Sequence, residues 1–372
     1  MKKFLIICLK VFLNFVYLFI KICPVRKNRV VMISRQANSI TLDFRLIKER
    51  LLRDNPKMEV IVLTKRFDNI KKNFVNYGLF TLKQMYYIAT SRVCVVDSYC
   101  IPVSILKHKK SLSVIQIWHS LGAIKEFGYQ TLGKASGREK TLSLAMNMHK
   151  NYDVIISGSE AMTVHFAKAF NYDESYFLNY GLPRIDYLLN EKNYLRKKIY
   201  KIYPSLKKKP VVMYAPTFRT DKSNSLSKLI KEFNFDKYNL ILKSHPNQKI
   251  DVSLDKVYQC PEFSALDLLA ISDVLITDYS AIAIEAAVLD IKLYYYVYDY
   301  DKYKHDNGLN IDLYEDMPGC VFDKSEDLIN AIEKVPYNKK ALLEYKKKYL
   351  PEKVGKSTEL ICKWIVDHCK GR

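Results

Sequence analysis

One histidine stands where an apolar run ends and a turn begins. His119 closes the run at 114–118, and the turn that follows carries Ser120, Gly122 and Lys125. The imidazole of histidine titrates near neutral pH, so at the end of a strand it can take a proton from an attacking hydroxyl. We predict that His119 is a general base and that the turn after it contacts an acceptor or shapes the loop. The alternative is a structural histidine satisfied by hydrogen bonds.

Polar and positively charged residues follow two later apolar runs. Thr217 and Arg219 come just after 211–215, and Lys243 and His245 close the run that begins at 240. Phosphoryl oxygens are held best by several N–H donors, and charged donors hold them most strongly. These residues therefore predict a positive clamp for phosphate, with solvated surface cations as the alternative.

A polar turn separates a fourth apolar run from an alanine-rich helical segment. Thr277 and Asp278 end the run, and Ser280 and Ala281 begin the helical segment. Amides at a helix start attract anions, so we predict a donor-phosphate site here. Glu285, one turn later, is placed to accept hydrogen bonds from ribose hydroxyls. The alternative is that Asp278 or Ser280 only caps the helix.

The elements that must position these residues alternate between strand and helix. Such alternation predicts parallel sheets covered on both faces, here two doubly wound domains of α/β class with ligands bound in the cleft between them. A highly charged stretch at 191–209 marks the expected boundary. We expect domains at 25–190 and 205–350, and a helix at 351–372 that packs back on the first domain.

The N-terminal segment 1–24 is apolar and free of acidic residues. On a helical wheel Lys3, Lys10, Asn14 and Lys21 fall in one narrow stripe. This pattern predicts an amphipathic helix that lies in the membrane interface with its lysines reaching lipid phosphates. A bilayer span and a buried helix of the fold remain the alternatives.

The composition and the absence of several motifs limit the partners and the reactions to be expected. The chain has 372 residues, is 49% hydrophobic and carries a net charge of +21, which suits nucleic acid, an anionic membrane or phosphorylated substrates. Its eight cysteines are scattered without metal-like spacing, as expected of reduced thiols in a cytosolic protein. P-loop, dinucleotide-binding, nucleophile-elbow and zinc-peptidase motifs are absent from the sequence, and no carboxylate cluster demands a metal.

Six segments together resemble the CDP-glycerol glycerophosphotransferase family, the teichoic-acid primases and polymerases, which have a GT-B-like fold. The segments are W-H-S-L-G-x-x-K (118–125), G-L-P-R-I-D (181–186), Y-A-P-T-F-R (214–219), K-S-H-P (243–246), T-D-Y-S-A-x-x-x-E (277–285) and the run at 307–319. The chain departs from the family pattern at Ser120, where many members have glycine, and at Ile185.

The resemblance implies transfer of glycerol phosphate from CDP-glycerol to an acceptor hydroxyl, with release of CMP, by a peripheral protein at the cytoplasmic face of the membrane. It implies His119 as the base, His245 near the donor phosphates, and Arg184 within a matching motif. The implied acceptor is a lipid-linked saccharide of teichoic acid or capsule, and no cofactor is expected. The short distance from the N-terminal helix to the first strand favours a primase-like enzyme.

Three alternatives stay open. A CDP-ribitol transferase would share every motif, and a glycosyltransferase using a nucleotide-sugar would share the fold and Glu285. A non-enzymatic basic protein would need an aromatic-interleaved basic stripe, which the sequence lacks, so nucleic acid is not expected as a partner. Self-association also stays open.

Overall fold

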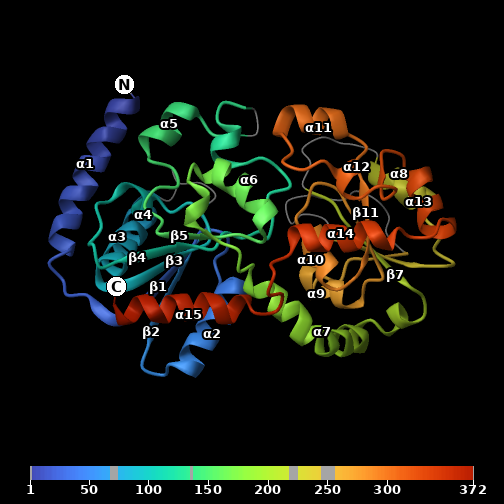
Figure 1. Ribbon diagram of the computed structural model, residues 1–372, viewed down its shortest axis with the longest axis horizontal. Coiled ribbons are helices and arrows are strands. Elements are labelled where there is room, and N and C mark those ends of the chain that lie inside the picture. The colour runs from blue at the N-terminus through green and yellow to red at the C-terminus, as the bar shows by residue number, and fades with distance from the viewer. Residues whose placement is uncertain (1, 68–73, 135–136, 218–224, 244–255, 372) are drawn as a thin grey trace. The chain divides into compact units, whose positions relative to one another are not determined.

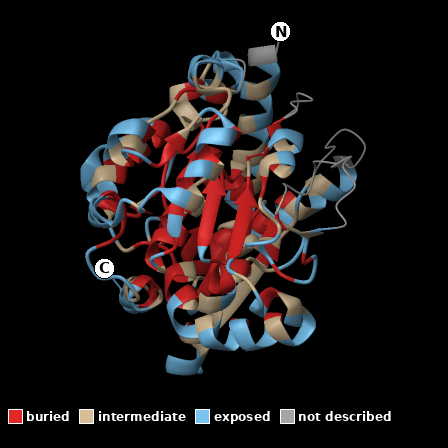
Figure 2. Cartoon of the chain, turned by 90° about the vertical axis from the view of Figure 1, so that its right-hand side faces the viewer, coloured by how far each residue is buried: buried red, intermediate tan, exposed pale blue. Residues whose placement is uncertain are grey.

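The computed structural model describes residues 2–67, 74–134, 137–217, 225–243 and 256–371, and they form two compact units. The first unit comprises 1–121, 127–184 and 351–372, and the second comprises 122–126 and 185–350. Each unit contains one six-stranded parallel sheet, so the predicted α/β class is confirmed. The strands are buried and the surrounding helices turn exposed faces to solvent (Figure 2).

The first sheet has the strand order β2-β1-β3-β4-β5-β6. Its strands are short and dominated by β-branched residues, as expected of strands covered on both faces. They are β1 (Arg26–Ser34), β2 (Glu59–Thr64), β3 (Ser91–Val96), β4 (Ser113–Gln116), β5 (Val154–Ile156) and β6 (Phe177–Leu178). The α-helices of this unit are α1 (Lys2–Ile20), α2 (Leu42–Asp54), α3 (Phe74–Thr90), α4 (Ile101–Ile105), α5 (Lys140–Ala145), α6 (Glu160–Phe170) and α15 (Ser357–Lys370).

The second sheet has the order β12-β11-β10-β7-β8-β9. Its strands are β7 (Val211–Ala215), β8 (Asn239–Leu242), β9 (Val257–Tyr258), β10 (Val274–Thr277), β11 (Lys292–Tyr296) and β12 (Val321–Phe322). The accompanying helices are α8 (Ser225–Glu232), α9 (Ala265–Leu268), α10 (Ile282–Val288), α11 (Tyr300–Asn307), α12 (Leu313–Asp316), α13 (Ser325–Lys334) and α14 (Lys339–Tyr349).

Strand order locates where each unit is suited to bind a ligand. In a doubly wound sheet the crevice opens beyond the carboxyl ends of the strands at which the order reverses. That point lies between β1 and β3 in the first sheet and between β7 and β10 in the second. The carboxyl ends of β1, β3, β7 and β10 are therefore the positions at which a ligand is expected.

Two segments outside the sheets differ in detail from the expected boundaries. The charged stretch at 191–209 falls largely on one long helix, α7 (Pro183–Ile202), and the units divide at Arg184. Helix α15 lies against α2, β1 and β3 of the first unit (Figure 1).

Helix α1 packs on the first unit through its polar stripe, a contact that the predicted interfacial helix did not include. Its polar stripe faces the protein: the Lys10 ammonium donates to the Ala145 carbonyl at 2.9 Å, and the Asn14 amide donates to the Ile105 carbonyl at 3.1 Å. Main-chain carbonyls accept hydrogen bonds from Lys10 and Lys21, so each ammonium has a protein partner that the sequence pattern did not predict.

The apolar face of α1 is the exposed one, with Phe12 at 60% exposure. Among the described residues, no helix combines the length and apolar character that crossing a bilayer requires.

All eight cysteines are free thiols. Six are buried, and burial raises the pKa of Cys100 and Cys369 to about 11. Only Cys8 on α1 is exposed, while Cys23, just beyond α1, is half-buried. Most of the thiols therefore behave as small core side chains.

Candidate functional site

His119 is presented by a strained turn at the end of β4. The Gln116 side chain accepts a hydrogen bond from the Trp118 amide at 2.8 Å, and Trp118 has a left-handed φ of 57°. A bulky residue adopts such a φ at a cost of about 1–3 kcal/mol, which the surroundings must offset. The Trp118 ring stacks on Phe127 with centroids 4.8 Å apart, and Phe170 packs edge-on against it. This packing fixes the turn that carries His119.

Main-chain and side-chain groups of neighbouring strand ends hold the imidazole. Nδ1 of His119 lies 2.9 Å from the Asp97 carbonyl oxygen and 3.2 Å from the Gln36 amide nitrogen. The two contacts make opposite demands on Nδ1, because a carbonyl oxygen only accepts and an amide N–H only donates. The shorter contact, to Asp97, favours a proton on Nδ1. A neutral ring in this tautomer carries its lone pair on Nε2, the form a general base needs.

Asp97 is a site residue that the sequence reasoning missed. It follows β3 directly, is 2% exposed, and receives a long hydrogen bond of 3.5 Å from Thr41. Burial raises its pKa to about 6, opposed by the hydroxyls of Ser34 and Ser98. The rule applied to His119, a polar side chain immediately after a strand, would have selected Asp97 as well.

Arg184 lies at the start of α7 and is paired with the first unit. Its main-chain amide donates to Asp43 at 2.9 Å and its guanidinium donates to the same carboxylate. Asp43 is buried in the first turn of α2. The arginine predicted to contact an acceptor or shape a loop thus ties α7 to α2.

The turn after His119 divides between the units. His119 and the half-buried Ser120 belong to the first, whereas Gly122 and Lys125 belong to the second. There the Asn310 amide donates to the carbonyls of Ala123 at 2.8 Å and Lys125 at 3.2 Å. The segment 307–319, which entered the sequence analysis only as a motif of the family resemblance, therefore holds the turn at 123–125 in place.

At the strand-order reversal of the second sheet, Thr217 and Asp278 are joined. The buried Asp278 carboxylate accepts from the Thr217 amide and hydroxyl, each at 2.9 Å, and from the Tyr279 amide at 2.7 Å. Thr277 donates its hydroxyl to the Ala215 carbonyl at 2.7 Å. These contacts lock the two strand ends beside each other.

The other predicted donor-site residues lie nearby in sequence and differ in burial. Ser280 and Ala281 are half-buried just before α10, and Glu285 is buried within it. The Lys243 ammonium donates to the Cys260 carbonyl at 3.2 Å, and burial lowers its pKa. Arg219 and His245 lie outside the described residues.

No group of His, Cys, Asp and Glu side chains within the described ranges is arranged to hold a metal ion. A histidine able to act as a base, and separately a pair of strand ends held by hydrogen bonds, are groups that a transferase can use.

Comparison with known proteins agrees with that class. The chain matches the family model described as CDP-Glycerol:Poly(glycerophosphate) glycerophosphotransferase over residues 15–367. It is 30% identical to the teichoic acid ribitol-phosphate primase of Bacillus spizizenii, across 92% of each chain. It is 28% identical to the teichoic acid glycerol-phosphate primase of Bacillus subtilis, across 82% of this chain and 84% of the relative.

The poly(ribitol-phosphate) polymerase of Bacillus spizizenii is 28% identical, and the chain spans only 58% of its length. The wall teichoic acid polymerase TagF matches in structure with a TM-score of 0.72 at 21% identity, across 99% of this chain and 98% of that chain. A UDP-GlcNAc 2-epimerase of Methanocaldococcus jannaschii matches with a TM-score of 0.56 at 15% identity, across 91% and 99%. These two show the fold alone.

The chain belongs to the CDP-glycerol:poly(glycerophosphate) glycerophosphotransferase family. The predicted family and transferase class are thereby confirmed, and the structural neighbours agree with the expected GT-B-like fold.

Proposed function

We propose that the protein transfers a polyol phosphate from a CDP-polyol to the hydroxyl of a lipid-linked saccharide. The acceptor oxygen attacks the β-phosphorus of the donor, and the bond from this phosphorus to the bridging oxygen breaks, so that CMP leaves. The observation that carries the proposal is the contact of His119 Nδ1 with the Asp97 carbonyl at 2.9 Å, which favours a lone pair on Nε2 and so supports His119 as the base. His119 then takes the acceptor proton as the new bond forms.

The second unit would hold the donor. The pair of Thr217 and Asp278 fixes the strand ends, and the main-chain amides of Ser280 and Ala281 would donate to the phosphates. Lys243, Arg219 and His245 would add positive charge as charge shifts to the leaving phosphate. Glu285 would accept from the ribose.

Replacement of His119 tests the base directly. We expect His119→Ala to lower kcat for CMP release by about 10²–10⁴-fold, because positioned proton transfer contributes that much, while CDP-glycerol affinity changes little. His305→Ala is the matched control, since His305 is an exposed histidine of α11 that contacts Asp306. Transfer by His119→Ala at the rate of the control would overturn the assignment.

The donor alcohol is the point at which a second candidate has support. Relatives named for ribitol phosphate and for glycerol phosphate match at 30% and 28% identity. CMP release from CDP-glycerol and CDP-ribitol, with a UDP-sugar as the third substrate, would rank the donors. A phosphodiester-linked polyol in the product supports the proposal, whereas a new glycosidic bond supports a sugar transferase.

A lipid-linked acceptor requires that the protein work at a membrane surface, and α1 is suited to this. Its outward face carries large apolar side chains, among them Phe4 at 69% exposure. The apolar residues Leu79 of α3 and Leu144 of α5 are also exposed, and both helices contact α1. We therefore place the protein peripherally on the cytoplasmic face, with the apolar side of α1 in the interface. Whether it associates with itself would be tested by light scattering.

A further inference from the structure

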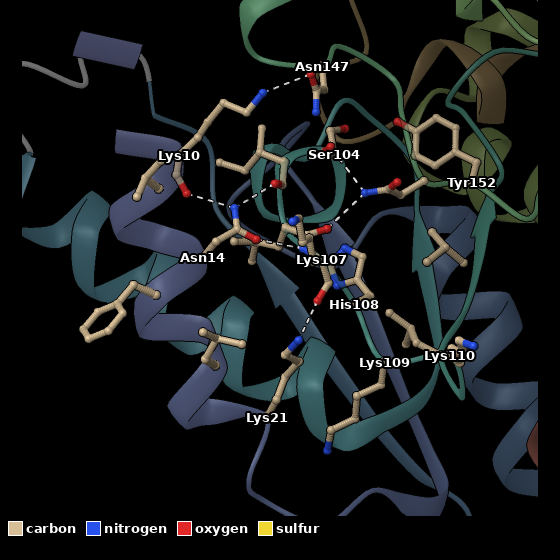
Figure 3. Close-up of a pocket in the computed structure, with 18 of the residues that line it drawn as sticks. Lys10, Asn14, Lys21, Ser104, Lys107, His108, Lys109, Lys110, Asn147 and Tyr152 are labelled. Carbon is tan, nitrogen blue, oxygen red and sulfur yellow. Dashed lines mark hydrogen bonds between the residues drawn. The ribbon is translucent and has the colours of Figure 1, made fainter. Parts of the chain in front are cut away.

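A groove of about 1150 Å³ lies within the first unit, between α1 and the segment that joins α4 to β4 (Figure 3). One wall is apolar and includes Val11, Phe15 and Leu18 of α1. Phe15 and Leu18 are also each 57% exposed, so this wall continues into the outward face of the helix. The groove is large enough for a headgroup and part of an aliphatic chain.

The rest of the lining is rich in lysine. Lys21 donates to the Lys107 carbonyl at 3.0 Å, and Lys109 donates to the Cys23 carbonyl at 2.6 Å. Each ammonium has three N–H donors, so these bonds leave donors on both groups for another acceptor. Lys107 and Lys110 contribute two more side chains to the lining (Figure 3).

The lining of the groove carries more lysines than acidic side chains. Asp153 is the single acidic residue of the lining, and its carboxylate accepts from the Val114 amide at 2.8 Å. Within the described part of the chain, no carboxylate forms an ion pair with Lys21, Lys109 or the other lysines of the lining. Burial lowers the pKa of Lys109, and the nearby charge of Lys21 lowers it further.

We propose that this groove binds an anionic phospholipid of the bilayer, with the phosphate among the lysines and an acyl chain along Phe15 and Leu18. The unbalanced lysines account for the phosphate, and the apolar wall accounts for the chain. A free phosphate would use only the lysines and would leave the apolar wall without a role. The site does not depend on the transfer reaction.

Three neutralising substitutions test the site in the full-length chain. Lys107→Gln, Lys109→Gln and Lys110→Gln are combined, and binding to phosphatidylcholine vesicles that contain phosphatidylglycerol is measured by co-sedimentation. A lysine at an anionic surface contributes about fivefold, so we expect a loss on the order of 100-fold. The matched control combines Lys207→Gln, Lys208→Gln and Lys209→Gln, three consecutive lysines with similar exposure. It should bind as the unchanged chain does.

Arginine at the same three groove positions should keep vesicle binding, which separates lost charge from lost folding. Dihexanoyl phosphatidic acid should bind more than tenfold more tightly than glycerol phosphate, since burying a few CH₂ groups gives that factor. CMP release with a soluble acceptor should be unchanged in the glutamine variant, so that failure of the transferase proposal stays distinguishable. Equal losses in the groove and control variants, or equal affinity for the two phosphate probes, would overturn the proposal.

Discussion

The carboxylate of Asp97 makes the first unit sensitive to pH. Burial raises its pKa from 3.8 to about 6, so the folded protein holds a proton there that the unfolded chain has lost. The free energy of unfolding therefore falls as pH rises from about 4 to 6, by about 3 kcal/mol if this group acts alone. We expect Asp97→Asn to remove that decline, as urea unfolding at several pH values would measure.

Asp97→Asn leaves the carbonyl that contacts His119 in place, so the tautomer of the base should persist. The variant should gain stability relative to the unchanged chain above pH 6 and show no gain below pH 4. A parallel decline with pH in both proteins would show that another group is responsible.

The hydrogen bond from the Thr217 hydroxyl to the buried Asp278 carboxylate should contribute to stability. Thr217→Val removes a hydroxyl donor but keeps the shape, so Asp278 loses one of its hydrogen bonds. We expect the free energy of unfolding to fall by about 1–3 kcal/mol. Thr217→Ser retains the hydroxyl and serves as the control in urea unfolding. Destabilisation by serine as large as that by valine, or none by valine, would show that the hydroxyl bond to Asp278 does not account for the loss.

The elements were predictable to different degrees. Strands such as β7 and β10 were bounded correctly, because each is a continuous β-branched or apolar run with a polar turn after it. The strands β9 and β12 were missed: each has two residues, too few for a period to be read. The spacing of polar residues likewise identified α1 as amphipathic. It could not show which face packs on the protein, because the partners are main-chain carbonyls, which every residue has.

The candidate site divides in the same way. His119 and Thr217 were found because they follow apolar runs. The structure places Thr217 after β7, beside the strand-order reversal, and His119 after β4, one strand beyond the reversal of the first sheet. The contact of His119 with a main-chain carbonyl, and the fixing of Lys125 by Asn310, depend on residues distant in sequence. Such pairings arise from the tertiary fold and could not be predicted from local pattern.

Two hydrogen bonds of Asn14 hold α1 against the loop that follows α4. Asn14 donates to the Ile105 carbonyl and accepts from the Lys107 amide at 2.9 Å, so Asn14→Ala removes both bonds. We expect hydrogen exchange of α1 amides to accelerate by about tenfold, the equivalent of about 1.4 kcal/mol. Phe12→Ala changes an exposed side chain of the same helix and is the control. Unchanged exchange in Asn14→Ala would mean that other contacts hold the helix.

On the scale of the whole molecule, the net charge of +21 serves more than one purpose. Some cations are structural, such as Arg184 on Asp43 and Lys10 on the Ala145 carbonyl. Others line the groove beside α1, where the protein supplies little opposing charge. A surplus distributed in this way favours attachment at defined points over uniform attraction to polyanions.

The exposure of Cys8 allows α1 to be labelled selectively with a fluorophore. Six cysteines are buried, so a maleimide dye used briefly on the folded protein should react at Cys8 and more slowly at Cys23. An environment-sensitive fluorophore on Cys8 would shift its emission to the blue when α1 enters lipid, with no engineered residue. The depth of the helix in a bilayer can then be followed by quenchers placed along the lipid chain.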